Sequence, residues 1–348
     1  MLDRRTLLKT SASALIASPL VNVRAQDSVT FRFHTFMSPA SDLWINGHLV
    51  WMKKIETESS GRIKFEAFPA MQLGGAPQQL FDQVRDGVVD VMWSLPGYTP
   101  GRFPKTEVFE LPFFTFDGEG TSKAAWEFAT SHAKDEFQGV HLLAFHTHSP
   151  GLFHTKGKLV KSVADLKGMK VRGATRKGTQ LLAAIGATPV GMPLPQIPDA
   201  LSKGIVDGVV LPWQVIPSVK VDELATFHSA MADGFPGLYN STQFMAMNPA
   251  KYNGLPKELR DVIDRNSGMG ASAFLGKVIQ DGDIPVRKRL SQDQKHTLHS
   301  LGKSETEEMI RLSAGIYDEW VKEMDRRGFD GSKLLSEARR LIEKYRKT

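Results

Sequence analysis

The sequence contains no cysteine among its 348 residues. This absence excludes disulfide bonds, metal sites built from thiolates and a cysteine nucleophile. No run of apolar residues reaches the length of about 18 that a membrane-spanning helix requires. Motifs of three enzyme classes are also missing, because the chain has no Gly-x-Ser-x-Gly elbow, no Walker phosphate loop and no His-Glu-x-x-His metal motif.

The composition is that of a globular protein large enough for two domains. Hydrophobic residues make up 41% of the chain, charged residues 24% and aromatic residues 9%. This proportion of apolar residues supports a sizeable core, and the length favours two domains over one. Nothing in the composition indicates a disordered or fibrous chain.

The positive net charge of +6 is concentrated partly at the N-terminus. The charged residues of positions 1–25 are Asp3, Arg4, Arg5, Lys9 and Arg24. Because this segment carries four positive charges and one negative charge, the remainder has a net charge of +3. Elsewhere charges of both signs are mixed along the predicted helices, as in Glu305–Arg311, which is typical of a solvated helix face. We therefore expect no nucleic-acid partner, since no basic stripe with interleaved aromatics is present.

Residues 1–25 have the pattern of a signal peptide. Paired arginines, Arg4 and Arg5, precede a mildly apolar stretch that is too short to span a membrane, and Val23 and Ala25 are small residues at the expected cleavage positions. The alternative is an ordinary frayed N-terminal helix. Paired arginines favour the twin-arginine route, so we predict a periplasmic protein.

The first half of the remaining chain predicts alternating strands and helices. The expected elements are strands at Val29–Phe36, Ile63–Phe68 and Val88–Trp93, and helices at Leu43–Thr57 and Leu80–Arg85. This order predicts a parallel, doubly wound sheet. Ligands of such sheets bind outside the carboxyl ends of the strands, so the loops after Phe36, Phe68 and Trp93 are candidate binding segments.

The second half repeats the same pattern. Strands are expected at Val140–His146, Leu152–His154, Met169–Arg172, Pro189–Val190, Val206–Leu211 and Gln243–Met247, and helices at Gly178–Ala184, Ile197–Lys203 and from Lys257 onward. No low-complexity linker separates the halves. We therefore expect two lobes between which the chain crosses more than once, with a ligand cleft between them.

Three histidines allow an alternative function. His146 and His148 would share one face of a strand, and His154 follows shortly after. Such a group is compatible with a three-histidine metal site and hence with a periplasmic metal-dependent hydrolase. No acidic residue lies nearby in the sequence to orient the rings, so hydrogen-bonded structural histidines are the preferred interpretation.

Several motifs, taken in order, resemble one family. Those of the N-terminal half are Ser59–Ile63, Phe68-Pro69, Gln72–Gly74, Gln83–Gly87, Asp90-Val91 and Glu110–Phe113. Those of the C-terminal half are Lys167–Arg172, Leu181–Val190, Met192–Leu194, Ala200-Leu201, Gly204–Gly208 and Gly254–Leu259. In order and spacing, over nearly all of residues 28–340, the chain resembles the DctP family, the solute-binding proteins of tripartite ATP-independent periplasmic (TRAP) transporters.

The resemblance implies a fold and a set of partners. It implies an α/β, two-lobed periplasmic binding protein of type II-like architecture, with two doubly wound mixed sheets joined by a hinge and long C-terminal helices. Lobe I would comprise residues 26–149 plus about 239–278, and lobe II residues 150–238 plus about 279–348. The partners would be a small and a large integral membrane subunit. No cofactor, metal or catalytic role is implied, and monomer and dimer both remain open.

Arg172 is the ligand-binding residue that the resemblance indicates most strongly. It ends a predicted strand, and the family's arginine at this place binds the solute carboxylate, which a guanidinium grips in a bidentate manner. Three polar positions of other relatives are leucines in this chain, namely Leu95, Leu152 and Leu211. Leucines would leave sugar hydroxyls unpaired at about 1–3 kcal/mol each. We therefore expect a monocarboxylate with an apolar or aromatic body, such as mandelate or benzoylformate.

Further lining residues are expected from the same match. Flat walls of the pocket would be provided by Trp93, Tyr98 and Trp213. Alternatively, the two tryptophans are simply core residues. The remaining candidates are the hydrogen-bonding residues His34 and Asn240 and the aromatic residues Phe36 and Phe153. Alternative functions are the binding of a C4-dicarboxylate or sugar acid, and service to an ABC importer or a sensor.

Overall fold

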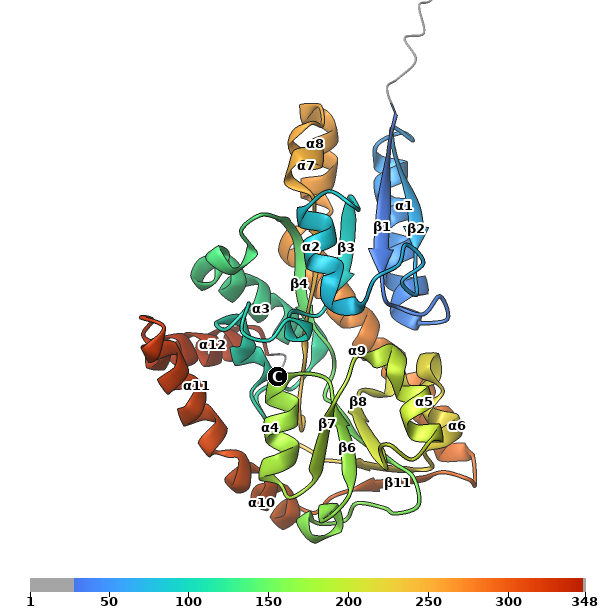
Figure 1. The fold of residues 1–348 in the computed structure, drawn as a ribbon, viewed down its shortest axis with the longest axis vertical. Coiled ribbons are helices and arrows are strands. Elements are labelled where there is room, and N and C mark those ends of the chain that lie inside the picture. The colour runs from blue at the N-terminus through green and yellow to red at the C-terminus, as the bar shows by residue number, and fades with distance from the viewer. Residues whose placement is uncertain (1–27, 347–348) are drawn as a thin grey trace, which may run out of the picture.

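The computed structural model describes residues 28–346 and consists of two lobes, each built on a mixed sheet (Figure 1). The predicted signal peptide lies outside the described residues. None of the helices within this part of the chain has both the length and the apolarity needed to span a bilayer. The two-lobed α/β architecture expected from the sequence is confirmed.

The first lobe contains a five-stranded sheet. Its strands lie in the order β2-β1-β3-β10-β4. Their bounds are β1 (Val29–Thr35), β2 (Ile63–Phe68), β3 (Val91–Ser94), β4 (His141–Thr147) and β10 (Thr242–Met247). Strands β2, β1 and β3 are parallel, whereas β10 runs antiparallel to both of its neighbours. A strand from the later part of the chain thus completes the sheet.

The second lobe contains a six-stranded sheet. Its strands lie in the order β11-β9-β5-β8-β6-β7. Their bounds are β5 (Leu152–Thr155), β6 (Lys170–Gly173), β7 (Thr188–Gly191), β8 (Gly208–Leu211), β9 (Phe227–Ala230) and β11 (Thr297–Ser300). Strands β8, β6 and β7 are parallel, so their carboxyl ends lie at one edge.

The helices cover the sheets and connect the lobes. The α-helices are α1 (Leu49–Glu58), α2 (Leu80–Arg85), α3 (Gly118–His132), α4 (Arg176–Ala184), α5 (Ile197–Ser202), α6 (Val221–Leu224), α7 (Pro249–Asn253), α8 (Lys257–Arg265), α9 (Gly268–Gln292), α10 (Lys303–Ser313), α11 (Gly315–Arg326) and α12 (Gly331–Tyr345). Short segments of other helix types include η1 (Leu43–His48), η3 (Pro96–Tyr98), η4 (Thr106–Glu110), η7 (Leu194–Gln196) and η8 (Trp213–Val219).

The chain crosses between the lobes at several places. The segments between β4 and β5 and between β9 and β10 each pass from one sheet to the other. Helix α9 packs on α3 and β4 of the first lobe and on η8 and β11 of the second, and it runs diagonally through the molecule in Figure 1. Farther on, α10 contacts α4 of the second lobe, whereas α12 lies on α3 of the first lobe. The C-terminal helices, assigned to lobe II from the sequence, therefore touch both lobes.

Most predicted elements are present, with local differences. The predicted helix Leu43–Thr57 begins with the π-helical turn η1 before α1, and β3 begins three residues later than expected. Helix α3 and strands β9 and β11 were not predicted. The two strands are four residues each and lack apolar alternation, so the pattern that identifies strands is absent from them.

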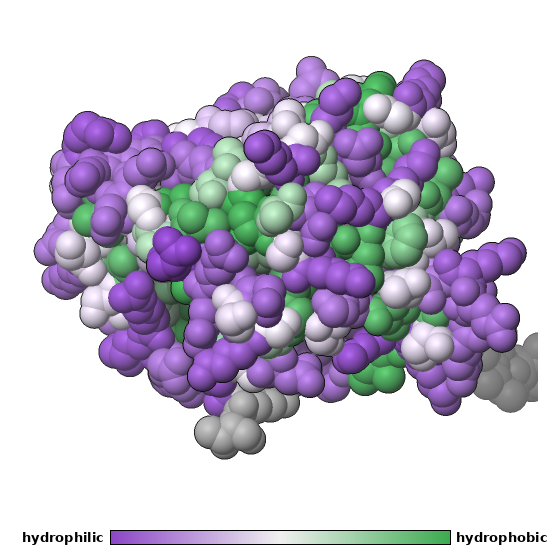
Figure 2. Space-filling view, turned by 90° about the horizontal axis from the view of Figure 1, so that it is seen from below, coloured by the Kyte–Doolittle hydropathy of each residue, from purple (hydrophilic) through white to green (hydrophobic). Residues whose placement is uncertain are grey.

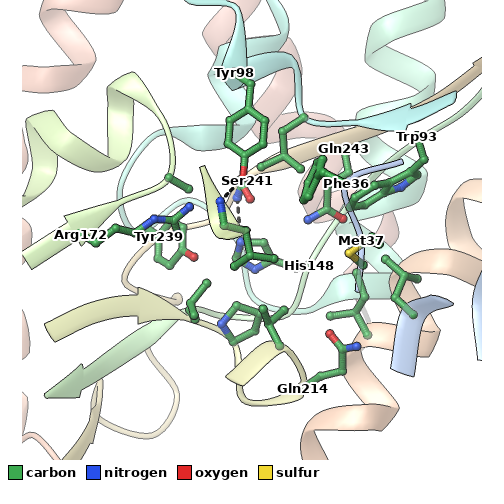
Figure 3. A pocket seen from close by; sticks show the side chains of 18 residues that line it. Phe36, Met37, Trp93, Tyr98, His148, Arg172, Gln214, Tyr239, Ser241 and Gln243 are labelled. Atoms are coloured by element: carbon green, nitrogen blue, oxygen red, sulfur yellow. Dashed lines mark hydrogen bonds between the residues drawn. The ribbon is translucent and has the colours of Figure 1, made fainter. Parts of the chain in front are cut away.

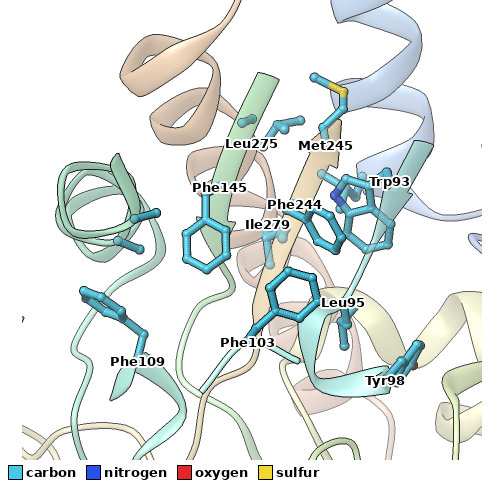
Figure 4. Close-up of a cluster of buried hydrophobic side chains, with 14 of the residues drawn as sticks. Trp93, Leu95, Tyr98, Phe103, Phe109, Phe145, Phe244, Met245, Leu275 and Ile279 are labelled. Atoms are coloured by element: carbon cyan, nitrogen blue, oxygen red, sulfur yellow. The ribbon is translucent and has the colours of Figure 1, made fainter. Parts of the chain in front are cut away.

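A dense hydrophobic core fills the first lobe and reaches the cavity between the lobes. Figure 4 shows Phe103, Phe145 and Phe244 packed together, with Trp93 and Leu95 beside them. Figure 2 shows that hydrophilic side chains dominate the face of the molecule seen from below, with hydrophobic groups confined to patches between them. The cavity therefore shares part of its wall with this core.

Candidate functional site

A cavity lies between the two lobes, at the carboxyl ends of two parallel strands from each sheet. The segments that follow β1 and β3 enclose it from the first lobe, and those at the ends of β6 and β8 enclose it from the second. The space between the surrounding atoms, open solvent at the mouth included, is about 430 Å³. The lining residues are Phe36, Met37, Leu43, Trp93, Leu95, Tyr98, His148, Arg172, Ala174, Leu194, Leu211, Pro212, Gln214, Val215, Tyr239, Ser241, Gln243 and Ile279.

Arg172 is the positively charged residue of this cavity. It is the third residue of β6, and only 1% of its surface is exposed. Its Nε donates a hydrogen bond to the Met192 carbonyl at 3.0 Å, which fixes the plane of the guanidinium. Its Nη1 is buried and has no hydrogen-bond partner, and Arg172 forms no ion pair with any carboxylate of residues 28–346. A buried cation without a counterion costs several kcal/mol, so the site favours an anion.

The polar groups around Arg172 are neutral. The Ser241 backbone N–H donates to His148 Nε2 at 2.9 Å, which leaves the ring proton on Nδ1 facing the Ser149 carbonyl at 2.5 Å. Burial, assisted by the nearby Arg172 charge, lowers the pKa of His148 to about 4. Tyr239 donates its hydroxyl proton to the Val210 carbonyl at 2.8 Å. The charge of the cavity at neutral pH is therefore that of Arg172.

Aromatic rings form one wall of the cavity. The Phe36 ring lies 5.3 Å from Trp93 and 5.2 Å from Tyr98, measured between ring centroids, and both pairs are tilted. Trp93 donates from Nε1 to His146 Nε2 at 2.8 Å, so the indole nitrogen is satisfied away from the cavity and its ring presents a flat apolar face. Figure 3 shows Phe36, Met37 and Trp93 on the opposite side of the cavity from Arg172. The arrangement separates a cationic end from an apolar end.

The two lobes touch each other beside the cavity. The Leu194 backbone N–H of the second lobe donates to the Tyr98 hydroxyl of the first at 2.9 Å. Arg176, in the first turn of α4, donates from Nε to Glu107 of η4 at 3.1 Å. A Cβ atom at Gly97 would lie 2.5 Å from Thr175 Cγ2, so the approach of the lobes requires glycine there. These contacts join the lobes around the cavity and hold it closed.

Six of the eleven candidate residues named from the sequence lie in the cavity wall. They are Phe36, Trp93, Leu95, Tyr98, Arg172 and Leu211. His34 and Asn240 lie outside the wall. His34 accepts from the Leu73 N–H and bonds Gln83 Oε1 at 2.8 Å, and Asn240 Oδ1 accepts from the His148 N–H at 3.2 Å. Both are buried, and Asn240 holds a neighbour of the site instead of facing the cavity.

The other three candidates lie in the second lobe away from this wall. Trp213 packs edge-on against His154, with centroids 5.2 Å apart, and together with Leu152 it faces a separate hollow near Asp283. Phe153 alternates to the opposite face of β5 and is fully buried in the core.

The three histidines of the alternative metal site do not converge on one point. His146 Nε2 accepts from Trp93, His148 bonds the backbone of Ser149 and Ser241, and His154 bonds His228 Nδ1 at 2.7 Å. Among residues 28–346, no group of three or more metal-binding side chains is placed to hold an ion. The rings serve as hydrogen-bonded structural groups within the described part of the chain.

Several lining residues were missed by sequence reasoning. The polar ones are Gln214, Tyr239, Ser241 and Gln243, and His148 was considered only as a metal ligand. Gln214 directly follows Trp213, so a one-residue shift along the turn after β8 separates the prediction from the structure. Ser241 directly precedes β10 and Gln243 is its second residue, so the alternation of an extended chain places both on one face once the strand is positioned beside β3.

Comparisons with known proteins agree on one family. A family model described as bacterial extracellular solute-binding protein, family 7 (DctP), matches residues 34–323. A TRAP solute-binding protein of Rhodoferax ferrireducens, solved with copurified benzoate, is 53% identical, covers 91% of this chain and 98% of that one, and superposes with a TM-score of 0.90.

Two further solved structures extend the similarity. A TRAP solute-binding protein from a marine metagenome, solved with 3-hydroxybenzoate, is 43% identical, covers 92% of this chain and 99% of that one, and has a TM-score of 0.89. A Bordetella bronchiseptica protein of the same class, solved with (R)- and (S)-mandelate, is 28% identical, with coverages of 91% and 99% and a TM-score of 0.84. This chain therefore belongs to the DctP family, the solute-binding proteins of TRAP transporters.

Proposed function

We propose that this protein captures an aromatic monocarboxylate in the cavity between its lobes and delivers it to the membrane subunits of a TRAP transporter. The observation that carries the proposal is the Arg172 guanidinium, buried with an unpartnered Nη1 and facing a cavity walled by Phe36 and Trp93. A carboxylate provides the missing counterion, and a planar ring fits between flat apolar walls.

The lining favours this ligand over the two alternative carboxylates. A C4-dicarboxylate would bring a second charge, and among the described lining residues Arg172 is the one with a permanent positive charge. A sugar acid carries a hydroxyl on nearly every carbon, and those hydroxyls that face Leu95, Leu211 and Ile279 would have no partner. Each hydroxyl left without a partner costs about 1–3 kcal/mol. Relatives solved with benzoate, 3-hydroxybenzoate and mandelate support an aromatic acid.

Transport follows from closure of the lobes. Ligand contacts with Arg172 of the second lobe and Phe36 of the first exist together only when the lobes meet, so they favour the closed state. Shifting a balance from 1:99 to 99:1 takes about 5.5 kcal/mol. A buried ion pair and a buried ring are together of that order. The proposal includes export by the twin-arginine route, a periplasmic location and no catalytic activity.

Calorimetric titration of the purified protein tests the ligand class. Benzoate, mandelate and benzoylformate should bind at least about 100-fold more tightly than succinate or galactonate, because about 3 kcal/mol separates a satisfied ligand from one with unpaired polar groups. Benzamide is the matched control, since it keeps the ring and lacks the charge, and it should bind weakly. Tighter binding of galactonate or succinate than of any aromatic acid would refute the proposal.

Delivery requires a separate experiment. Uptake of the bound acid into proteoliposomes that contain the two integral subunits should depend on this protein and on an ion gradient. Uptake that requires ATP hydrolysis would favour an ABC importer instead.

A further inference from the structure

Two buried glutamines in the cavity have amide atoms without hydrogen-bond partners. Gln214 is 2% exposed, and neither its Oε1 nor its Nε2 has a partner in the described structure. Gln243 is 6% exposed, and its Oε1 is likewise without a partner. A buried amide left unsatisfied costs free energy comparable to a lost hydrogen bond, and such groups are rare in folded proteins. Two of them in one cavity indicate a polar ligand group.

Gln214 is held in place by helix α9. Its backbone N–H donates to Asp283 Oδ1 at 2.7 Å, and the other oxygen of Asp283 accepts from Ser149 Oγ at 2.5 Å. A Cβ atom at Gly282 would lie 2.6 Å from Gln214 Cγ, so the glycine leaves room for the glutamine stem. Both the backbone and the stem of Gln214 are therefore fixed, and the amide is presented in a set position.

Gln243 is held in place by the sheet of the first lobe. It lies on β10 opposite His146 of β4, two residues before Met245, which pairs with Trp93. Alternation along the strand places Gln243 on the same face as Met245, and hence on the side of the Trp93 ring. Figure 3 shows Gln214 and Gln243 on the side of the cavity where Met37 and Trp93 lie, away from Arg172.

The amides fit one class of polar group. A hydroxyl both donates and accepts, so it satisfies a glutamine Oε1 and a glutamine Nε2. A second carboxylate only accepts, so it could pair with Gln214 Nε2 but would leave Oε1 of both glutamines unpaired, and its charge would have no cation beside it. We propose that Gln214 and Gln243 form a second polar subsite, which selects aromatic carboxylates with a hydroxyl on the ring away from the carboxylate. The inference rests on the proposed function and specifies its ligand.

Titrations with benzoate and its three hydroxy isomers test the subsite. In the wild-type protein, 3- or 4-hydroxybenzoate should bind at least about tenfold more tightly than benzoate, because each new hydrogen bond also relieves a buried unsatisfied amide. The matched ligand control is 2-hydroxybenzoate, whose hydroxyl lies beside the carboxylate and should bring no such gain.

Three variants locate the effect. Gln214→Leu and Gln243→Leu should each reduce the preference for the hydroxy acid to about threefold or less. Benzoate should bind to each variant as tightly as before or more tightly, because the cavity then contains one unpaired amide fewer. Retained benzoate binding also shows that the variants fold. Gln292→Leu, at the exposed end of α9, should keep the wild-type preference.

The outcomes separate the inference from the proposed function. Equal affinity of the wild-type protein for benzoate and for 3- and 4-hydroxybenzoate would overturn the subsite while leaving aromatic-acid binding intact. A preference that survives both glutamine substitutions would overturn the assignment to these residues. Failure of every aromatic carboxylate to bind would overturn the proposed function and the subsite together.

Discussion

Replacement of Arg172 by methionine isolates the contribution of the guanidinium. Methionine keeps an unbranched apolar stem in the position of the arginine stem and removes the charge and its donors. The wild-type side chain is 1% exposed, bonds the Met192 carbonyl and has an unpartnered Nη1. Binding of a carboxylate at this atom creates a buried ion pair, and removal of one partner then leaves a buried, uncompensated charge.

The expected loss of affinity is large. Breaking a buried ion pair by removing one partner costs about 3–5 kcal/mol. At about 1.4 kcal/mol per factor of ten, Arg172→Met should weaken benzoate binding by about 100- to 4,000-fold. The unfolding free energy of the ligand-free protein should change by only about 1 kcal/mol, because the lost hydrogen bond to Met192 is offset by relief of the buried charge.

Ligand-dependent unfolding provides the assay. At a concentration of 100 times the dissociation constant, benzoate should stabilise the wild-type protein by about 2.7 kcal/mol. With affinity reduced 100-fold, the same concentration should stabilise Arg172→Met by only about 0.4 kcal/mol. Arg289→Met is the matched control, because Arg289 is half exposed and pairs with Asp222 in the second lobe, away from the cavity. This variant should bind benzoate as tightly as the wild-type protein. An affinity of Arg172→Met within threefold of the wild-type value would refute the role of the guanidinium.

Three further predictions concern buried groups around the site. Burial lowers the pKa of His48 from 6.5 to about 3, so the folded protein is destabilised by this group as the pH falls below 6.5. The unfolding free energy of His48→Leu, taken relative to that of the wild-type protein, should therefore be about 2 kcal/mol higher at pH 5 than at pH 7. Burial raises the pKa of Glu110 from 4.5 to about 7, so its proton stabilises the fold below pH 4.5 and this contribution is lost as the pH rises to 7. The unfolding free energy of Glu110→Gln, taken relative to that of the wild-type protein, should therefore be about 3 kcal/mol higher at pH 7 than at pH 4.5. Chemical denaturation without ligand measures both the His48 and the Glu110 variant. Gly151→Ala would place a Cβ atom 2.0 Å from the Tyr239 ring, and titration should show at least about tenfold weaker benzoate binding because the ring is displaced in the cavity wall.

A specific result would refute each of these three predictions. Parallel pH profiles of His48→Leu and the wild-type protein would show that His48 does not titrate on unfolding, and the same comparison applies to Glu110→Gln. For Gly151→Ala, the control is alanine at Gly270, where a Cβ atom meets nothing within 4 Å. Equal benzoate affinity of the two alanine variants would show that Tyr239 tolerates the shift.

The sequence identified the elements and the cation because their signals are local. Apolar alternation placed β1 and β2, and the motif that ends in Arg172 placed the arginine at a strand end. The three leucine positions were predicted by comparison with family motifs, and two of them, Leu95 and Leu211, line the cavity. Residues adjacent to regular strands were predictable because strand ends and side-chain alternation are encoded in neighbouring residues.

Other parts of the site depend on contacts between distant segments. Gln243 and Trp93 line the same cavity only because β10 inserts between β3 and β4. Gln214 is fixed by Asp283, which lies 69 positions later in the chain. Likewise, His34 turns away from the cavity to bond Gln83 and the Leu73 backbone, which no pattern around His34 reveals.

The sequence by itself determined the class of fold, the positions of most strands and the arginine that lines the cavity, since these follow from short-range patterns and motifs. Only the tertiary structure decided which polar side chains complete the cavity. Their positions are set by strand pairing and by α9, and pairing between segments far apart in the chain is settled by packing and not by local sequence.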